Sequence, residues 1–260
     1  MVERRPILFC CTHSAGEANT SIALAGELAR RGVPDLWFAS DENNRAAVEA
    51  PADRSEVEFV SLGEVNPRLA LTMLDEQTYN KVMQPSRTKS VQARICQLSD
   101  ADHHFARYRK LDELVTKVEP AVMVVNRFCM YAIQVAIARD IPYVISAPCL
   151  PSSLLEYALP KDYPTPSSGL PLRMSWSQRM TNWYFRTFMK FIFLNRTILK
   201  QAMEFNKHMV ELKMDVDNTR VRVQHEKAGM LLCFSVFGLD YPFPVPEELR
   251  TLGSPFRGGA

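Results

Sequence analysis

Glycine is scarce in this chain, and the glycine-rich motifs that bind phosphate groups are absent. The 260 residues include 10 glycines against 17 prolines. No G-x-G-x-x-G follows a strand-like run, and no G-x-x-x-x-G-K-[ST] occurs. The H-E-x-x-H and G-x-S-x-G motifs are also missing. A phosphate-cradling glycine loop therefore has no support in the sequence.

The chain also lacks an excess of charge of either sign. Its 31 Lys and Arg residues nearly balance 29 Asp and Glu residues, which leaves a net charge of +2. Without a basic field we expect no nucleic-acid partner. Hydrophobic residues make up 47% of the chain and charged residues 23%, which is close to the globular average and excludes global disorder.

Cysteine spacing excludes the common metal-binding patterns. Six cysteines are present, at positions 10, 11, 96, 129, 149 and 233. They form no C-x-x-C pair and no His/Cys cluster at zinc spacing, so we expect no metal site. We interpret them as reduced, buried thiols of an intracellular protein.

Long apolar runs are missing as well. No stretch of about 18 uncharged apolar residues occurs, so no membrane-spanning helix is expected. The first residues, Met-Val-Glu-Arg-Arg-Pro, lack the apolar core of a signal peptide. These features indicate a cytoplasmic protein.

Short apolar runs alternate with amphipathic stretches along the chain. We expect strands at residues 7–11, 36–39, 57–60, 121–125, 142–146 and 231–234. We expect helices at residues 17–31, 41–50, 90–118 with room for one break, 128–139 and 176–214. The run at 121–125 is continuously apolar, which is typical of a buried parallel strand. The alternation predicts an α/β fold with a Rossmann-like, doubly wound parallel sheet.

Proline interrupts this pattern between residues 148 and 171. Six prolines in that segment exclude a regular element, so we expect an ordered long loop or a lid. The helical stretch that follows places Phe185, Phe188 and Phe191 on one face, with Arg179 and Arg186 roughly opposite. Three roles remain open for this helix: packing on the core, forming the wall of an apolar pocket, or contacting a membrane surface.

Four segments, in the same order and at similar spacing, resemble the family 1 UDP-sugar glycosyltransferases. The first is the strand Ile7-Leu8-Phe9 followed by Gly16-Glu17-Ala18-Asn19 and by Leu28-Ala29-Arg30-Arg31-Gly32. Its Gly-x-Ala-Asn form is most similar to fungal-type members. The other segments are residues 120–126, residues 141–148, and the stretch from the strand at 231–234 to Leu252-Gly253-Ser254-Pro255.

The resemblance covers the acceptor-binding half of a two-domain GT-B enzyme. It implies that residues 1–256 form an acceptor-binding domain, with a proline-rich loop at 148–171, a helical insertion at 175–214 and a tail at 257–260. The C-terminal donor domain has no counterpart in the sequence, so no cofactor is expected in this chain. A complete relative would use a UDP-sugar donor and transfer the sugar by direct displacement without metal.

The resemblance also implies a catalytic dyad whose two positions are altered here. In the family a turn histidine acts as base and an aspartate at the end of the fourth buried strand orients it. Those positions are Glu17 and Asn126 in this sequence. Because Ser14-x-x-Glu17 fits a capping box, we favour a capping role for Glu17, kept ionised by the helix N-terminus. His13, four residues earlier in the turn, is a second candidate base.

The acceptor is expected to lie against Gly16, Asn19, Phe128, Pro148, Phe185 and Phe188. We predict a glycosyltransferase-like acceptor half for a small lipophilic hydroxylated molecule of secondary metabolism, inactive by itself. The alternative is a non-catalytic small-molecule-binding or partner protein. In either case a separate donor-domain chain or self-association would cover the exposed interdomain face, and peripheral membrane contact stays open.

Overall fold

Seven parallel strands form one sheet at the centre of the molecule. The computed structural model describes residues 5–50, 57–70, 73–98, 100–166, 168–191, 194–236 and 238–252. The strands are β1 (Ile7–Cys10), β2 (Leu36–Asp41), β3 (Val57–Gly63), β4 (Val122–Asn126), β5 (Tyr143–Ala147), β6 (Met230–Phe234) and β7 (Leu249–Leu252). Their order across the sheet is β3-β2-β1-β4-β5-β6-β7. The predicted parallel, Rossmann-like α/β sheet is therefore confirmed.

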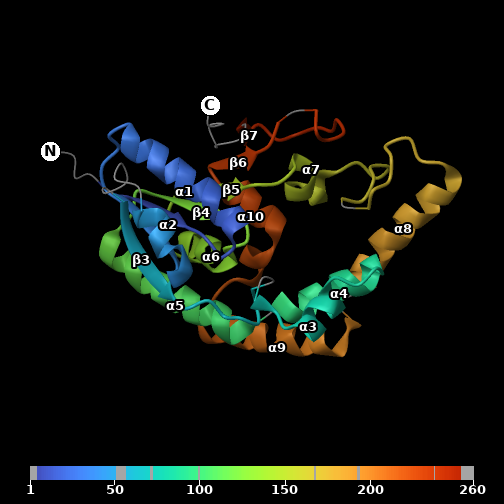
Figure 1. Cartoon of the computed structure of the whole chain (residues 1–260), viewed down its shortest axis with the longest axis horizontal. Coiled ribbons are helices and arrows are strands. Elements are labelled where there is room, and N and C mark those ends of the chain that lie inside the picture. Colours follow the sequence, from blue (N-terminus) through green and yellow to red (C-terminus); the bar gives the residue numbers. More distant parts are fainter. Residues whose placement is uncertain are drawn as a thin grey trace.

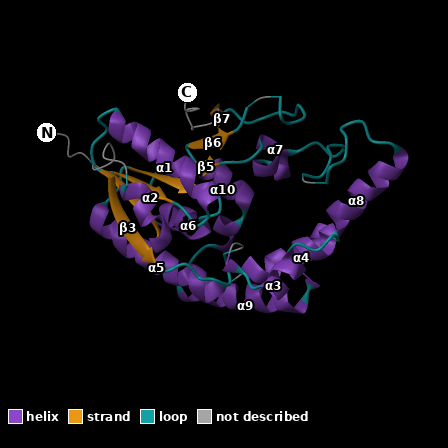
Figure 2. Cartoon of the chain, viewed as in Figure 1, coloured by secondary structure: helices purple, strands orange, loops and turns teal. Residues whose placement is uncertain are grey.

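Helices cover the sheet on both sides (Figures 1 and 2). The described helices that flank it or connect its strands are α1 (Ala15–Arg30), α2 (Arg45–Glu49), α3 (Glu76–Val82), α4 (Arg87–Leu98), α5 (Ala101–Val118), α6 (Met130–Ala138), α9 (Arg196–Glu211) and α10 (Val221–Lys227). Helix α8 (Trp176–Phe191) instead extends away from the sheet as an arm (Figure 1).

Several boundaries differ from the sequence expectation. The expected helical stretch at 90–118 has the one break that the sequence allowed, and the second helix begins where Asp100 caps α5 by accepting a hydrogen bond from the His103 backbone N–H at 2.9 Å. The proline-rich segment is not wholly irregular, since it holds α7 (Pro151–Leu154) and a 3₁₀ turn (Glu156–Ala158). Proline at the first position of α7 is compatible with a helix because no backbone N–H is needed there. Helix α3 and strand β7 were not predicted. Residues 253–260, including the expected tail, lie outside the described residues.

The core consists of two apolar layers, one on each face of the sheet. Helix α1 packs Ala18, Ile22 and Ala25 on one face, against Phe9 and neighbouring side chains of β2 and β3. Helices α5, α6 and α9 cover the other face around the fully buried Phe105. The two layers share strands because successive side chains of a strand point to opposite faces.

The cysteines are free thiols distributed through this core. Cys10, Cys11, Cys129 and Cys233 are buried, as expected. Cys96 and Cys149 are only half-buried, so the expectation of complete burial is wrong for these two. Cys149 follows the end of β5, where the chain leaves the core.

The proline-rich segment is held in place by hydrogen bonds to a second loop. The Asp240 carboxylate accepts hydrogen bonds from the Ser152 backbone N–H at 2.7 Å and from the Tyr163 hydroxyl at 2.9 Å. Tyr163 is buried and packs edge-on against Phe243. This network orders the segment without regular secondary structure, as the sequence predicted for most of its length.

Helix α8 attaches to the same segment through its polar side. The Asn182 amide bonds to the backbone of Tyr163 and Thr165, and the Arg186 guanidinium donates to the Tyr163 carbonyl at 2.7 Å. The interpretation of α8 as a helix packed on the sheet core is therefore wrong. No helix among the described residues is long and apolar enough to cross a membrane.

An ion pair is buried where β2 ends. The Arg107 guanidinium of α5 lies 2.5 Å from the Asp41 carboxylate, and both side chains are 6% exposed. Arg107 also donates to the Glu64 carbonyl at 2.5 Å, which ties the end of β3 to α5. Each charge is tolerated in the interior only because the other is present.

We expect Asp41→Asn to lower the free energy of unfolding by about 3–5 kcal/mol, because it leaves the Arg107 charge buried without its partner. Urea denaturation at pH 7 measures the effect. Glu226→Gln is the matched control, since it breaks the exposed Arg222–Glu226 pair and should change stability by less than about 1 kcal/mol. Equal effects of the two variants would show that burial does not decide the contribution of the ion pair.

Candidate functional site

Strands β1 and β4 define the point where a ligand crevice is expected. Strand β1 pairs with β2 on one side and with β4 on the other, so the chain order reverses between β1 and β4. In open α/β sheets the ligand crevice lies outside the carboxyl ends of the strands at such a reversal. The turn after β1 carries His13, the first turn of α1 carries Gly16 and Glu17, and β4 ends at Asn126.

The start of α1 has no side-chain cap at its N-cap residue. Ser14 occupies the N-cap position, but its side chain makes no capping hydrogen bond. Its carbonyl accepts from the backbone N–H groups of Glu17 and Ala18, at 3.0 and 2.8 Å. The capping-box interpretation of Glu17 is therefore wrong, because the carboxylate has another partner.

That partner is Asn126. Its side-chain Nδ2 donates to Glu17 Oε2 at 2.6 Å, across 109 positions of sequence. The Asn126 Oδ1 atom accepts from the Phe128 backbone N–H at 3.0 Å, which fixes the orientation of the amide. Asn126 is fully buried. The structure thus brings together the two positions that the sequence assigned to a dyad.

The charge on Glu17 is controlled by burial more than by the helix. Burial raises the pKa of the Glu17 carboxyl, while the Asn126 hydrogen bond and the Arg127 charge lower it by less. The expectation that the helix N-terminus makes this carboxylate a weak base is therefore wrong in direction. A carboxylate with a raised pKa is better matched to proton transfer near neutral pH.

Arg127, which the sequence reasoning missed, contacts the groups around this pair. Its guanidinium donates to Cys149 Sγ at 2.7 Å and stacks over the Phe128 ring at 4.5 Å from the centroid. The Cys233 thiol and the Arg127 guanidinium together lower the pKa of Cys149. Burial and the Arg127 charge lower the pKa of His225 to about 4, so this imidazole is neutral at pH 7. The position of Arg127 directly after the strand-end Asn126 is the signal that could have identified it.

His13 faces a different partner. Its Nδ1 atom lies 3.6 Å from the Asp41 carboxylate, which Arg107 also holds. The backbone of the turn is fixed by Asn43, whose amide donates to the His13 carbonyl at 3.1 Å. His13 is therefore oriented by a carboxylate that the sequence reasoning did not identify, and it forms a second polar cluster beside β2.

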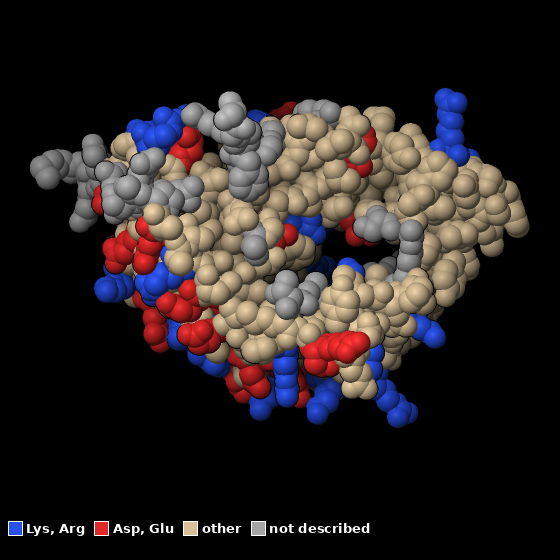
Figure 3. All heavy atoms as spheres, viewed as in Figure 1, with Lys and Arg blue, Asp and Glu red and all other residues tan. Residues whose placement is uncertain are grey.

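The predicted acceptor-contacting residues fall into two groups. Gly16 and Asn19 are exposed on the first turns of α1, Phe128 is 54% exposed after β4, and Pro148 follows β5. These four follow the carboxyl ends of β1, β4 and β5, where the crevice is expected. Phe185 and Phe188 lie on α8, which a hollow separates from the sheet body (Figure 3). The structure does not bring these two rings to the Glu17–Asn126 pair.

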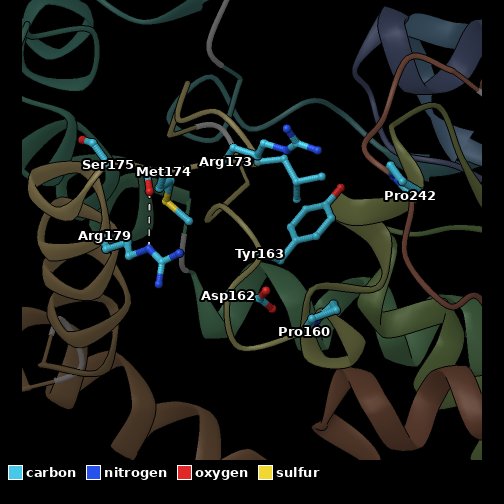
Figure 4. Close-up of a pocket in the computed structure, with 9 residues that line it drawn as sticks. Pro160, Asp162, Tyr163, Arg173, Met174, Ser175, Arg179 and Pro242 are labelled. Atoms are coloured by element: carbon cyan, nitrogen blue, oxygen red, sulfur yellow. Dashed lines mark hydrogen bonds between the residues drawn. The ribbon is translucent and has the colours of Figure 1, made fainter.

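A cavity of about 700 Å³ lies away from the crevice, between the proline-rich segment and the start of α8 (Figure 4). It is lined by Pro160, Asp162, Tyr163, Leu172, Arg173, Met174, Ser175, Arg179 and Pro242. Arg179 closes one side by donating to the Met174 carbonyl at 3.3 Å. None of the predicted acceptor-contacting residues lines this cavity.

Among the described residues no group of three or more His, Cys, Asp or Glu side chains is arranged to hold a metal ion.

Comparison with known proteins identifies the fold. No protein-family model matches the chain, and no curated protein sequence matches it. CalG4, the calicheamicin glycosyltransferase, is 14% identical with a TM-score of 0.53, and the match covers 97% of this chain and 52% of that one. At this identity the likeness shows the fold alone: a parallel α/β sheet of the kind that forms half of a GT-B glycosyltransferase.

Two further solved structures align at lower scores. The glycotransferase of kitacinnamycin is 16% identical with a TM-score of 0.49, covering 89% of this chain and 46% of its own. A UDP-glucosyltransferase from Polygonum tinctorium is 15% identical with a TM-score of 0.48, covering 100% of this chain and 55% of its own. This chain spans about half the length of these neighbours.

We expect Asn126→Asp to lower the free energy of unfolding at pH 8 by about 1–3 kcal/mol, because it removes a donor and sets two carboxylates against each other. The pair then shares a proton, and the pKa of one carboxyl rises in the folded state. The stability that depends on this proton is present below pH 4 and is lost as pH rises through the raised pKa. Urea denaturation between pH 4 and pH 8 follows the loss.

The double variant Glu17→Gln with Asn126→Asp is the control. It exchanges donor and acceptor, so the hydrogen bond is restored and the loss at pH 8 should be largely recovered. Equal stability of the single and double variants at pH 8 would show that the Glu17–Asn126 contact is not formed in solution.

Proposed function

We propose that this chain is the acceptor-binding half of a UDP-sugar-dependent hexosyltransferase. In this proposal a small lipophilic molecule with a hydroxyl group, such as a sterol or a secondary metabolite, binds in the crevice between the carboxyl ends of β1 and β4. These residues do not transfer sugar by themselves in this proposal, because the UDP-sugar is held by a donor domain that lies outside them.

The hydrogen bond between Asn126 and Glu17 carries this proposal. It joins two polar side chains at the strand reversal, where a ligand crevice is expected, and it fixes one carboxylate oxygen. Oxygen Oε2 accepts the Asn126 amide, whereas Oε1 has no hydrogen-bond partner among the residues the structure describes. Oε1 is therefore available to accept an acceptor hydroxyl.

The residues divide the work of such a site. Glu17 takes the hydroxyl proton as general base, and its raised pKa suits that role. Asn126 is a positioning residue, because it holds the carboxylate without contacting the acceptor. The exposed ring of Phe128, which Arg127 backs by stacking, offers an apolar surface to the acceptor.

We expect the purified chain to bind at least one member of a panel of hydroxylated sterols and flavonols, measured by isothermal titration. Phe128→Ala should weaken that binding about tenfold, because an exposed aromatic contact is lost. Tyr79→Ala, which removes an exposed ring on α3, is the matched control and should leave the affinity unchanged. UDP and UDP-glucose should not bind.

Tight UDP binding by this chain would contradict the proposal that these residues bind only the acceptor. Binding of the panel that is insensitive to Phe128→Ala would place the acceptor elsewhere. In that case the cavity beside Tyr163 would be the next site to test.

A non-catalytic binding protein is the second candidate, and one observation favours it. The Asn126 hydrogen bond and the Arg127 charge both oppose the burial that raises the pKa of Glu17. If these two effects outweigh burial when a ligand binds, the pKa of Glu17 is lowered. The carboxylate then accepts a hydrogen bond from the ligand hydroxyl without removing its proton.

Fusion of a family 1 donor domain to the unaltered chain separates the two candidates. We expect the fusion to glucosylate an acceptor from the panel, with kcat reduced at least 100-fold by Glu17→Gln through loss of the base. His13→Gln is the control for the second cluster and should have a smaller effect. Acceptor binding without any transfer by the fusion would favour the non-catalytic protein.

A further inference from the structure

Helix α8 buries a polar side chain and exposes large apolar ones. Asn182 is 4% exposed and bonds to the backbone of Tyr163 and Thr165, and the half-buried Arg186 bonds to the same loop. Phe185 and Phe188 are half-buried as well. Trp176, Trp183 and Phe191 are 78%, 61% and 60% exposed.

The exposed apolar residues of α8 form one face. Positions 176, 180, 183, 184 and 191 follow helical spacing, and they hold the residues Trp176, Met180, Trp183, Tyr184 and Phe191, which we call the α8 face. Figure 3 shows this end of the molecule as almost entirely uncharged, with single basic side chains projecting from it. A continuous apolar face of this kind indicates a binding surface.

The charge of the surrounding segment restricts what can cover the face. Residues 163–203 contain no Asp or Glu, although the chain has 29 of them. The same segment contains six basic residues: Arg173, Arg179, Arg186, Lys190, Arg196 and Lys200. It therefore carries +6 while the rest of the chain carries −4. The composition of the segment is unlike that of the chain as a whole.

A second copy of the chain is a poor partner for this face. Two copies joined through the same surface would bring two segments of +6 together, and like charges repel across an interface. An anionic bilayer offers the complementary charge together with an apolar interior. Tryptophan and tyrosine are the residues enriched at the boundary between lipid headgroups and acyl chains.

We propose that the α8 face binds the surface of an anionic lipid bilayer. The helix lies in the plane of the interface, with the rings of Trp176, Trp183 and Phe191 inserted between headgroups. The flanking basic residues other than Arg186, which holds the loop, pair with lipid phosphates or carboxylates. Asn182 and Arg186 keep the helix attached to the proline-rich loop, so the protein docks as a whole.

The experiment measures flotation of the full chain with vesicles of phosphatidylcholine alone or with phosphatidylserine added. We expect binding to the anionic vesicles that is at least about tenfold stronger than to the zwitterionic ones and that weakens with added salt. Brominated acyl chains should quench the tryptophan fluorescence. Trp176 and Trp183 belong to the α8 face, whereas the third tryptophan, Trp37, lies in β2.

Two triple variants locate the contact. Trp176→Ser with Trp183→Ser and Phe191→Ser should reduce binding to anionic vesicles at least about tenfold, because it removes the apolar insertion. Val216→Ser with Val221→Ser and Leu239→Ser replaces three exposed apolar residues elsewhere and should leave binding within twofold. Circular dichroism checks that both variants keep the helical content of the unaltered chain.

Three results would overturn the proposal. They are no binding of the unaltered chain to anionic vesicles, equal binding by the two triple variants, or concentration-dependent dimers in light scattering that only the α8 variant abolishes. The third result would assign the face to a second copy. None of these results depends on acceptor binding, so the proposal stands or falls separately from the proposed function.

Discussion

The parallel pairing of β1 with β4 is the constraint on which the rest of the molecule depends. The register that pairs Cys10 with Val125 brings the residues after each strand to the same edge of the sheet. Asn126 then lies beside the turn that carries Glu17, although 109 positions separate them. The apolar layers on the two faces hold this register, because a shift of one residue would turn buried side chains toward solvent. The candidate chemistry is thus a consequence of sheet packing, and no local motif is needed to create it.

The Glu17–Asn126 pair exchanges the hydrogen-bond roles of the dyad that the resemblance implies: the residue on α1 accepts and the residue at the end of β4 donates. A histidine base needs a carboxylate to stabilise the positive charge it acquires, whereas a carboxylate base needs a donor that holds it in place and leaves one oxygen free. Asn126 supplies that donor, and its own oxygen is occupied by the Phe128 backbone N–H, so the amide cannot turn over. Considered singly, each of the two residues is a departure from the family pattern. Considered together, they are chemically consistent, because both members of the pair change.

The sequence predicted what depends on local pattern and failed where a distant residue decides. The apolar run at 121–125 is a strand in the structure, and Gly32 ends α1 with a positive φ of 73°, as a glycine after a helix should. Ser14 and Glu17 also fit a local pattern, the capping box, but the buried amide of Asn126 outcompetes the helix for the carboxylate. The contact between His13 and Asp41 could not be predicted from the sequence for the same reason, since it requires β2 to lie beside β1. For helix α8 the sequence left three roles open, because nothing local reveals that Asn182 is buried against the proline-rich loop.

The two proposed binding surfaces lie on different parts of the molecule, and each requires an apolar partner. A crevice for a lipophilic acceptor at the carboxyl ends of β1 and β4 has to receive a molecule that partitions out of water. The α8 face has to be covered by an apolar phase, and the basic segment around it favours an anionic one. Between them lies the loop that Asp240, Tyr163 and Ser152 hold in place, which also lines the cavity at the start of α8. Asn182 and Arg186 fasten α8 to this loop through the Tyr163 carbonyl. The hydrogen bonds of one proline-rich segment therefore fix where the proposed docking surface is attached to the rest of the molecule.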